Sequence, residues 1–153
     1  MTANTDHLSG TPAPFGTGAT PARRLARRSG AVFAGLLTIF AVTTATDLLL
    51  HATGVFPPFG ERMSDALFLL ATAYRVLYGI AGSYVTARLA PDRPLEHALA
   101  LGTLGVLIST AGAVAMWNYG PGWYSLAIIA IALPCAWLGG KLRTRELETA
   151  TRP

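Results

Sequence analysis

Long apolar runs dominate the chain, and the longest stretch without charge is the most informative. Between Ala98 and Gly140 the sequence contains no Asp, Glu, Lys or Arg. A membrane-crossing helix needs about 20 predominantly apolar residues, so this stretch is long enough for two crossings. The segment NYGPG, from Asn118 to Gly122, supplies a turn between them. A buried helix of a soluble protein would show a polar edge over such a length. The pattern therefore predicts an all-α, polytopic membrane protein.

The same pattern predicts a four-transmembrane-helix bundle over residues 30–143. Ser64 and Asp65 are typical of a helix start, Pro94 is typical of a first helical turn, and Gly139–Gly140 suit a helix end. The expected spans cover residues 31–55, 65–89, 95–117 and 123–140. Outside them we expect a disordered tail at residues 1–29, which carries a basic stretch, and a short tail at residues 144–153.

Basic residues are distributed unevenly between the two ends of the expected bundle. One end carries Arg23, Arg24, Arg27, Arg28, Arg88, Arg93, Lys141, Arg143, Arg145 and Arg152, whereas the opposite end carries only Arg62. The opposite end also carries the aromatic residues expected of an interfacial belt: Phe56, Phe59, Trp117, Tyr119, Trp123 and Tyr124. The positive-inside rule therefore predicts that both termini are cytoplasmic.

Composition supports membrane residence and gives the net charge a plain source. The chain has 153 residues, of which 52% are hydrophobic and 13% charged, whereas soluble domains contain roughly 25% charged residues. The formal charge of +4 does not indicate nucleic acid, because every basic residue except Arg75 lies outside the apolar runs or at their ends. We expect the lipid bilayer as the partner, leave a homo-oligomer or a second membrane protein open, and expect no nucleic acid.

The first apolar run has a second interpretation. Arginines followed by an apolar run and small residues also describe a signal peptide, here with cleavage between Thr46 and Asp47. The arginine-containing segment is long for a signal peptide, and the apolar run resumes as LLLHATGVF, which favours a membrane span. Cleavage would leave three spans and would remove the first segment from the topology prediction.

Two opposite charges interrupt the first two spans. Asp47 lies in the first and Arg75 near the middle of the second. A charge at a helix centre costs about 2.5–3.5 kcal/mol on insertion scales, whereas each Leu, Ile, Phe or Val returns only about 0.3–0.6 kcal/mol. At about 1.5 Å per residue, Asp47 and Arg75 lie about 12 Å and about 15 Å from the span ends that share one membrane face. These matched depths predict a buried ion pair between them.

A polar stripe surrounds the expected pair. Thr43, Asp47 and His51 are spaced four residues apart and therefore share one helix face. Tyr78 lies on the face of Arg75, and we expect it to donate a hydrogen bond to the Asp47 carboxylate. These residues form a candidate intramembrane polar site, which would line a water-filled cavity open to the outer side. The alternative is a fixed structural ion pair, and solvent access to Asp47 discriminates between the two.

The remaining candidate residues do not assemble into a reaction centre. His51 and His97 lie near opposite membrane faces and cannot share a metal ion. The single Cys135 excludes an intrachain disulfide and a multi-cysteine metal site. Neither Gly-x-Ser-x-Gly nor His-Glu-x-x-His occurs. We therefore expect no enzyme activity, no metal and no cofactor.

Three segments together resemble a family of small bacterial four-span membrane proteins that has no assigned activity. They are residues 47–98, which begin DLLLHATGVF, then WNYGPGWY at 117–124 and LPCAWLGG at 133–140. The resemblance covers about residues 30–143 and implies a helical bundle in the inner membrane without a catalytic role. The small multidrug-resistance transporters match poorly, since the first loop is long here and Arg75 opposes Asp47.

The expected function is that of an integral inner-membrane protein which serves as a structural or accessory unit. The alternative is a small transporter or channel subunit with an Asp47/Arg75 polar site. A dry pair would favour the first function, and a wet pair would favour the second.

Overall fold

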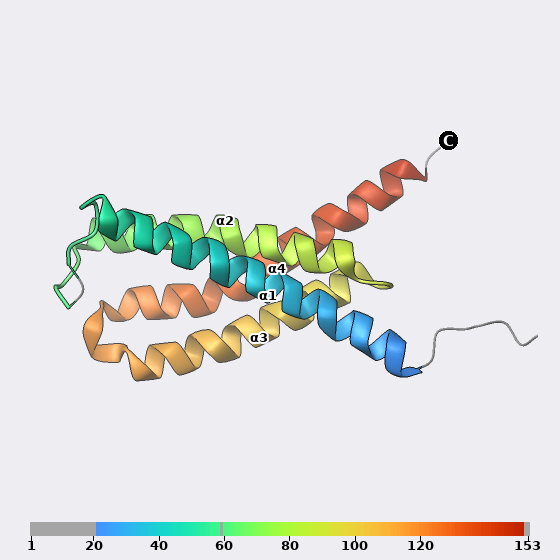
Figure 1. The fold of residues 1–153 in the computed structure, drawn as a ribbon, viewed down its shortest axis with the longest axis horizontal. Coiled ribbons are helices and arrows are strands. Elements are labelled where there is room, and N and C mark those ends of the chain that lie inside the picture. Colours follow the sequence, from blue (N-terminus) through green and yellow to red (C-terminus); the bar gives the residue numbers. More distant parts are fainter. Residues whose placement is uncertain (1–20, 59, 152–153) are drawn as a thin grey trace, which may run out of the picture.

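Four long helices and one short 3-10 helix form the structure, a computed structural model that describes residues 21–58 and 60–151 (Figure 1). The long helices are α1 (Pro21–Ala52), α2 (Asp65–Leu89), α3 (Pro94–Ala115) and α4 (Gly122–Ala150), and the 3-10 helix η1 (Trp117–Tyr119) precedes α4. Each of the four long helices is long and apolar enough to cross a membrane. The prediction of an all-α, four-helix polytopic membrane protein is therefore confirmed.

The helices run alternately in opposite directions, so the connections fall at two opposite ends (Figure 1). Residues 53–64 join α1 to α2, and residues 116–121 join α3 to α4, both at one end. Residues 90–93 join α2 to α3 at the other end, where α1 begins. We call the first the aromatic end, after Phe56, Trp117, Tyr119, Trp123 and Tyr124, and the second the arginine end, after the arginines in residues 23–28 and 88–93.

The helix bounds agree with the apolar pattern for α2, whereas α1 and α4 begin or end well outside it. α1 ends at Ala52 and α3 at Ala115, three and two residues before the predicted span ends. α2 covers residues 65–89, as predicted, and Pro94 occupies the first turn of α3. α1 already begins at Pro21, so the prediction of a disordered tail was wrong for residues 21–29, while residues 1–20 lie outside the described residues. α4 continues to Ala150, so the segment expected to be a C-terminal tail is helical as far as that residue.

Both extensions have local causes. Residues 22–28 consist of Ala, Arg and Leu, which have high helix propensity, and Pro21 suits the first helical position. In α4, Gly139–Gly140 do not end the helix, because both glycines are buried where α4 packs on its neighbours. Farther along, the Tyr84 hydroxyl of α2 donates one hydrogen bond that is shared by the two Glu146 carboxylate oxygens, each 2.9 Å away, which ties this part of α4 to the bundle.

Small residues let α1 and α2 approach closely in the half of the bundle nearest the arginine end. A Cβ atom on Gly35 would overlap the Thr86 hydroxyl oxygen and would lie 2.5 Å from the Gly82 carbonyl oxygen. Thr86 is fully buried, and its hydroxyl has no conventional hydrogen-bond partner among the described residues. The interaction that remains for the Thr86 hydroxyl oxygen is therefore a weak C–H···O contact with the Gly35 Cα.

The other helices also meet through small residues in this half. Three further contacts share this character: Gly102 with Ala136, Gly140 with Ala98, and Gly139 with the α2 backbone at Ile80. Such residues are the usual contact points of packed membrane helices. Towards the aromatic end the buried residues become large, with Phe56, Phe68 and Tyr74 among them. The helices therefore meet tightly in one half, while larger side chains separate them in the other.

α1 has the fewest neighbours, because it packs chiefly on α2 and touches α3 far less. At the arginine end, Arg28 of α1 donates a hydrogen bond to the Asp92 carboxylate in the α2–α3 connection. This hydrogen bond lowers the pKa of the Asp92 carboxyl. Because the pKa is lowered in the folded protein, the contact is present at neutral pH and is lost as the pH falls through that lowered pKa.

Replacing Gly35 with alanine should destabilise the bundle, because the new methyl group would overlap the Thr86 hydroxyl. Overpacking of this kind costs about 1–3 kcal/mol. Gly30→Ala is the matched control on the same helix, since nothing lies within 4 Å of its Cβ position. Thermal unfolding followed by circular dichroism in detergent should show a lower midpoint for Gly35→Ala alone. An unchanged midpoint for Gly35→Ala would contradict the close approach of α1 and α2.

Candidate functional site

The expected ion pair between α1 and α2 is present. Nη2 of Arg75 donates to Oδ2 of Asp47 at 2.7 Å. The helices are antiparallel neighbours, and helical side chains tilt towards the N-terminus of their own helix, so the Arg75 side chain leans towards the aromatic end. The two side chains remain 24% and 29% exposed, Arg75 and Asp47 respectively. The pair is therefore enclosed by the bundle without being sealed inside it.

Tyr74 completes the arrangement around the carboxylate. Its hydroxyl donates to Oδ1 of Asp47 and accepts a 3.0 Å hydrogen bond from Nη1 of Arg75. Each of the three side chains thus contacts the other two, and we call Asp47, Tyr74 and Arg75 the polar cluster. Tyr74 is 8% exposed, so Asp47 and Arg75 contribute most of the accessible polar surface of this cluster.

The prediction that Tyr78 donates to Asp47 was wrong. The Tyr78 hydroxyl lies 3.0 Å from the Thr46 hydroxyl, which itself donates to the Val42 carbonyl at 2.9 Å. Since the Thr46 proton is used on Val42, Tyr78 is the donor in its contact with Thr46. Tyr78 lies one helical turn farther from the aromatic end than Tyr74, and it therefore meets α1 beside Asp47 rather than at its carboxylate.

The other two residues of the predicted stripe lie on either side of Asp47. His51 lies towards the aromatic end, where its Nδ1 is 2.8 Å from the Asp47 carbonyl oxygen and its ring packs edge-on against Phe56. A carbonyl oxygen only accepts, so Nδ1 carries the proton in this contact. Thr43 lies one turn deeper, and its buried hydroxyl has no hydrogen-bond partner in the part of the chain that the structure describes.

Aromatic rings enclose the Arg75 guanidinium. Its Cζ atom lies 5.1 Å from the centroid of the Tyr74 ring and 5.9 Å from that of the Tyr124 ring on α4. Both distances suit cation–π attraction, which strengthens where water is displaced. The Tyr124 ring packs in turn on Phe68, with 4.9 Å between centroids. The sequence pattern assigned Tyr124 to the interfacial belt alone and did not predict its contact with the arginine.

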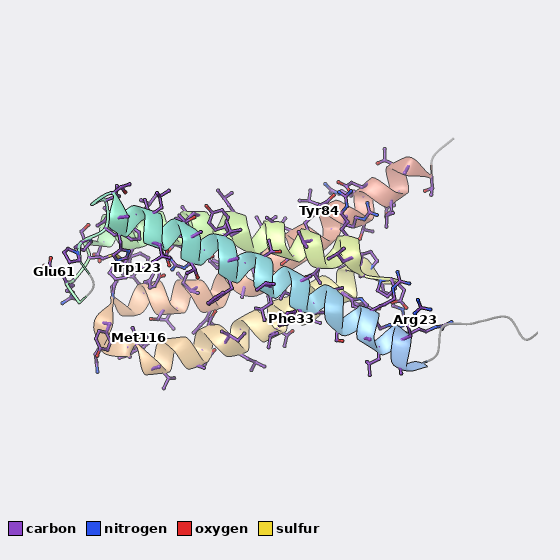
Figure 2. All side chains as sticks on the ribbon, viewed as in Figure 1. Arg23, Phe33, Glu61, Tyr84, Met116 and Trp123 are labelled. Carbon is purple, nitrogen blue, oxygen red and sulfur yellow. The ribbon has the colours of Figure 1, made fainter. Side chains whose placement is uncertain are left out.

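A pocket of about 370 Å³ leads from the aromatic end to the polar cluster. We call it the vestibule, and its polar side chains are Asp47, His51, Glu61, Arg62, Arg75 and Asn118. Glu61 lies at the outer limit of this end, near Trp123 and Met116, whereas Arg23 marks the opposite end (Figure 2). The two acids and two arginines in the wall balance in charge. Asp47 and Arg75 are the vestibule residues that lie farthest along their helices from this end.

A second pocket of about 390 Å³ adjoins the opposite side of the polar cluster. We call it the cleft, and all four long helices contribute to its wall. Asp47 and Arg75 line both the vestibule and the cleft. The remaining wall of the cleft is mostly apolar, although it includes Thr43, Thr44, Ser83 and Ser109. The polar cluster thus lies between a pocket whose wall carries further charged side chains and one whose wall carries none.

The polar cluster leaves hydrogen-bond donors of Arg75 available to a ligand. The recorded contacts of the Arg75 guanidinium are those to Asp47, Tyr74 and, at 3.5 Å, the Ala71 carbonyl oxygen. They use three of its five N–H groups. Thr43 lines the cleft, and its hydroxyl is buried without a hydrogen-bond partner among the described residues. Available donors on a cationic side chain suit an anionic oxygen group.

Metal-binding residues do not gather in the described part of the chain. No group of three or more His, Cys, Asp or Glu side chains that could hold a metal ion occurs within residues 21–58 and 60–151. His97 lies in the first turn of α3 at the arginine end, where its Nδ1 is 3.2 Å from the Arg93 carbonyl oxygen. It is therefore at the opposite end of the bundle from His51.

No family model matches the chain, and neither a curated protein nor a solved structure matches it. The resemblance to a family of small bacterial four-span membrane proteins therefore stays a prediction. The site has to be interpreted from its own geometry.

Asp47→Asn and Arg75→Gln should each lower stability, because each leaves the partner's charge without its counter-ion. Loss of a partner in this partly exposed setting costs about 1–3 kcal/mol. The double variant should cost less than the sum of the two single changes. Arg88→Gln, on the same helix but at the arginine end, is the control and should change little. Thermal unfolding in detergent measures all four variants, and additive losses would show that Asp47 and Arg75 do not interact.

Proposed function

We propose that this chain is a small transporter or channel subunit of the bacterial inner membrane, and that its polar cluster binds a solute carrying an anionic group. The observation that carries the proposal is the position of Asp47 and Arg75. Both line a pocket that leads to the aromatic end, and both keep about a quarter of their side-chain surface exposed. A solute that enters the vestibule from this end meets the polar cluster next.

The charge pattern supports an orientation in which both termini are cytoplasmic. Of the eleven Lys and Arg residues in the described part of the chain, nine belong to segments at the arginine end, one lies in the α1–α2 connection, and one is Arg75 itself. The positive-inside rule places the side richer in Lys and Arg in the cytoplasm. In this orientation the vestibule opens to the periplasm.

An anion suits the polar cluster better than a cation does. The Asp47 carboxylate already accepts hydrogen bonds from Tyr74 and Arg75, so its charge is compensated by two donors. Arg75 retains N–H groups beyond its recorded contacts. An anionic oxygen can therefore bind the guanidinium without first displacing Asp47, whereas a cation would have to compete with Arg75 itself.

A structural or accessory role is the second candidate, and the same polar cluster favours it. The hydrogen bonds among Asp47, Tyr74 and Arg75 join α1 to α2, and α1 has few other contacts with the bundle. In that role the cluster fixes the position of α1 and binds nothing. The two functions differ in one property, which is whether a solute reaches Arg75.

Exchange of small anions through liposomes tests the proposal. Liposomes that contain the pure protein should exchange anions faster than empty liposomes, because Arg75 provides a binding site within the membrane. The double variant Asp47→Asn/Arg75→Gln, which carries no unpaired charge, should remove the difference. Arg88→Gln is the matched control on the same helix and should keep it. Exchange no faster than through empty liposomes would favour the structural role, and undiminished exchange in the double variant would show that the polar cluster is not the anion site.

A further inference from the structure

The cleft on the far side of the polar cluster is long, narrow and open to the surroundings of the bundle. Its wall runs along α1 from Leu36 to Asp47 and along α3 from Leu101 to Ser109. At 1.5 Å per residue these segments are roughly 12–16 Å long. Phe40 and Ile108, which line the cleft, are 67% and 49% exposed. The cleft therefore opens sideways between α1 and α3, where a membrane would present its lipid.

The shape of the cleft suits a slender occupant. Its volume is about 390 Å³, and it extends over roughly 12–16 Å along α1 and α3, so a single hydrocarbon chain can lie in it along the helices. The apolar wall favours the same occupant, since burial of apolar surface is its main source of affinity.

Charged groups lie at one end of the cleft only. Asp47 and Arg75 lie where the cleft adjoins the vestibule, and the Thr43 hydroxyl lies one turn away on the same wall. This hydroxyl is buried without a hydrogen-bond partner among the described residues. By contrast, Thr38 and Thr46 of the same helix donate to the carbonyl four residues earlier. A buried donor without a partner is costly, and rotation of the Thr43 side chain would bring its hydroxyl to an acceptor of a ligand in the cleft.

We infer that the ligand of the polar cluster is a single-chain amphiphile with an anionic oxygen head group. The inference rests on the proposed function and names its substrate class. The head group accepts hydrogen bonds from the remaining N–H groups of Arg75 and from the Thr43 hydroxyl. The hydrocarbon chain lies in the cleft between α1 and α3, directed towards the arginine end. The vestibule gives water and any further polar part of the head group access from the aromatic end.

Dodecyl phosphate is the probe for this inference. The protein is purified in dodecyl maltoside, whose chain has the same length and whose head group carries no charge, so the detergent itself competes for the cleft. Binding is followed as the rise in the thermal midpoint with increasing mole fraction of probe in the micelle. Dodecyl phosphate should raise the midpoint. Dodecyltrimethylammonium, with the opposite charge, and inorganic phosphate, without a chain, should not.

Two variants test the head-group end and the mouth of the cleft separately for their contribution to dodecyl phosphate binding. Thr43→Val removes one hydrogen-bond donor to a charged head group at nearly constant volume, and it should weaken binding about tenfold or more. Ile108→Trp places a large side chain at the mouth of the cleft and should weaken binding to a similar extent. Leu107→Trp is its control, because Leu107 is 63% exposed on the same helix and does not line the cleft. It should bind dodecyl phosphate normally.

Each of the following outcomes would overturn the inference, and only the last would also contradict the proposed function. If inorganic phosphate stabilises the protein as strongly as dodecyl phosphate, the polar cluster binds anions and the cleft does not hold a chain. If Thr43→Val and Ile108→Trp bind dodecyl phosphate normally, the probe binds elsewhere. If Ile108→Trp instead converts a dimer to a monomer in native mass spectrometry, a second copy covers the cleft. If neither phosphate binds, the proposed anion site is wrong as well.

Discussion

An arginine near the middle of a membrane helix needs a compensating contact, and the contact between Arg75 and Asp47 is the one on which the rest of this structure depends. A central charge costs about 2.5–3.5 kcal/mol on insertion scales, and the 2.7 Å contact with Asp47 offsets part of that cost. It also fixes the register of α1 against α2, because a shift by one turn would separate the two charges. Tyr74 bonds to both partners and so limits the positions that either can adopt.

The distribution of residue sizes determines where this pair meets solvent. Near the arginine end, Gly35, Gly82 and Thr86 bring α1 and α2 into close contact. Near the aromatic end, Phe68 and Tyr124 occupy the space between α2 and α4. The helices are thus closest in the half of the bundle near the arginine end, which has no polar cluster. They are farther apart towards the aromatic end, where the polar cluster lies. The vestibule and the cleft follow from that difference, and both are bordered by Asp47 and Arg75.

Much of this arrangement follows from the sequence, and the exceptions have physical causes. The span of α2 and the depth of the ion pair were predictable, because hydropathy and a rise of 1.5 Å per residue determine them. Tyr74 was missed because neighbours in sequence point to different faces of a helix, and a search along the face of Arg75 finds Tyr78 instead. Tyr74 and Arg75 reach Asp47 from two sides, which only the packing of α1 on α2 reveals. The extent of α4 was missed because Gly139–Gly140 serve interhelical packing rather than helix termination. The cleft depends on how far α1 stands from α3, a distance that no single helix encodes.

The central claim is that water reaches the polar cluster. Solid-state NMR of the protein in lipid bilayers measures this directly, through the rate at which magnetisation passes from water to the Arg75 guanidinium nitrogens. The Arg75→Gln variant assigns the signal. The account predicts transfer about as fast as to Arg62, which lies in the α1–α2 connection and lines the same vestibule. Transfer as slow as to the buried backbone at Gly82 and Ala98 would contradict it and would leave Asp47 and Arg75 as a dry structural pair.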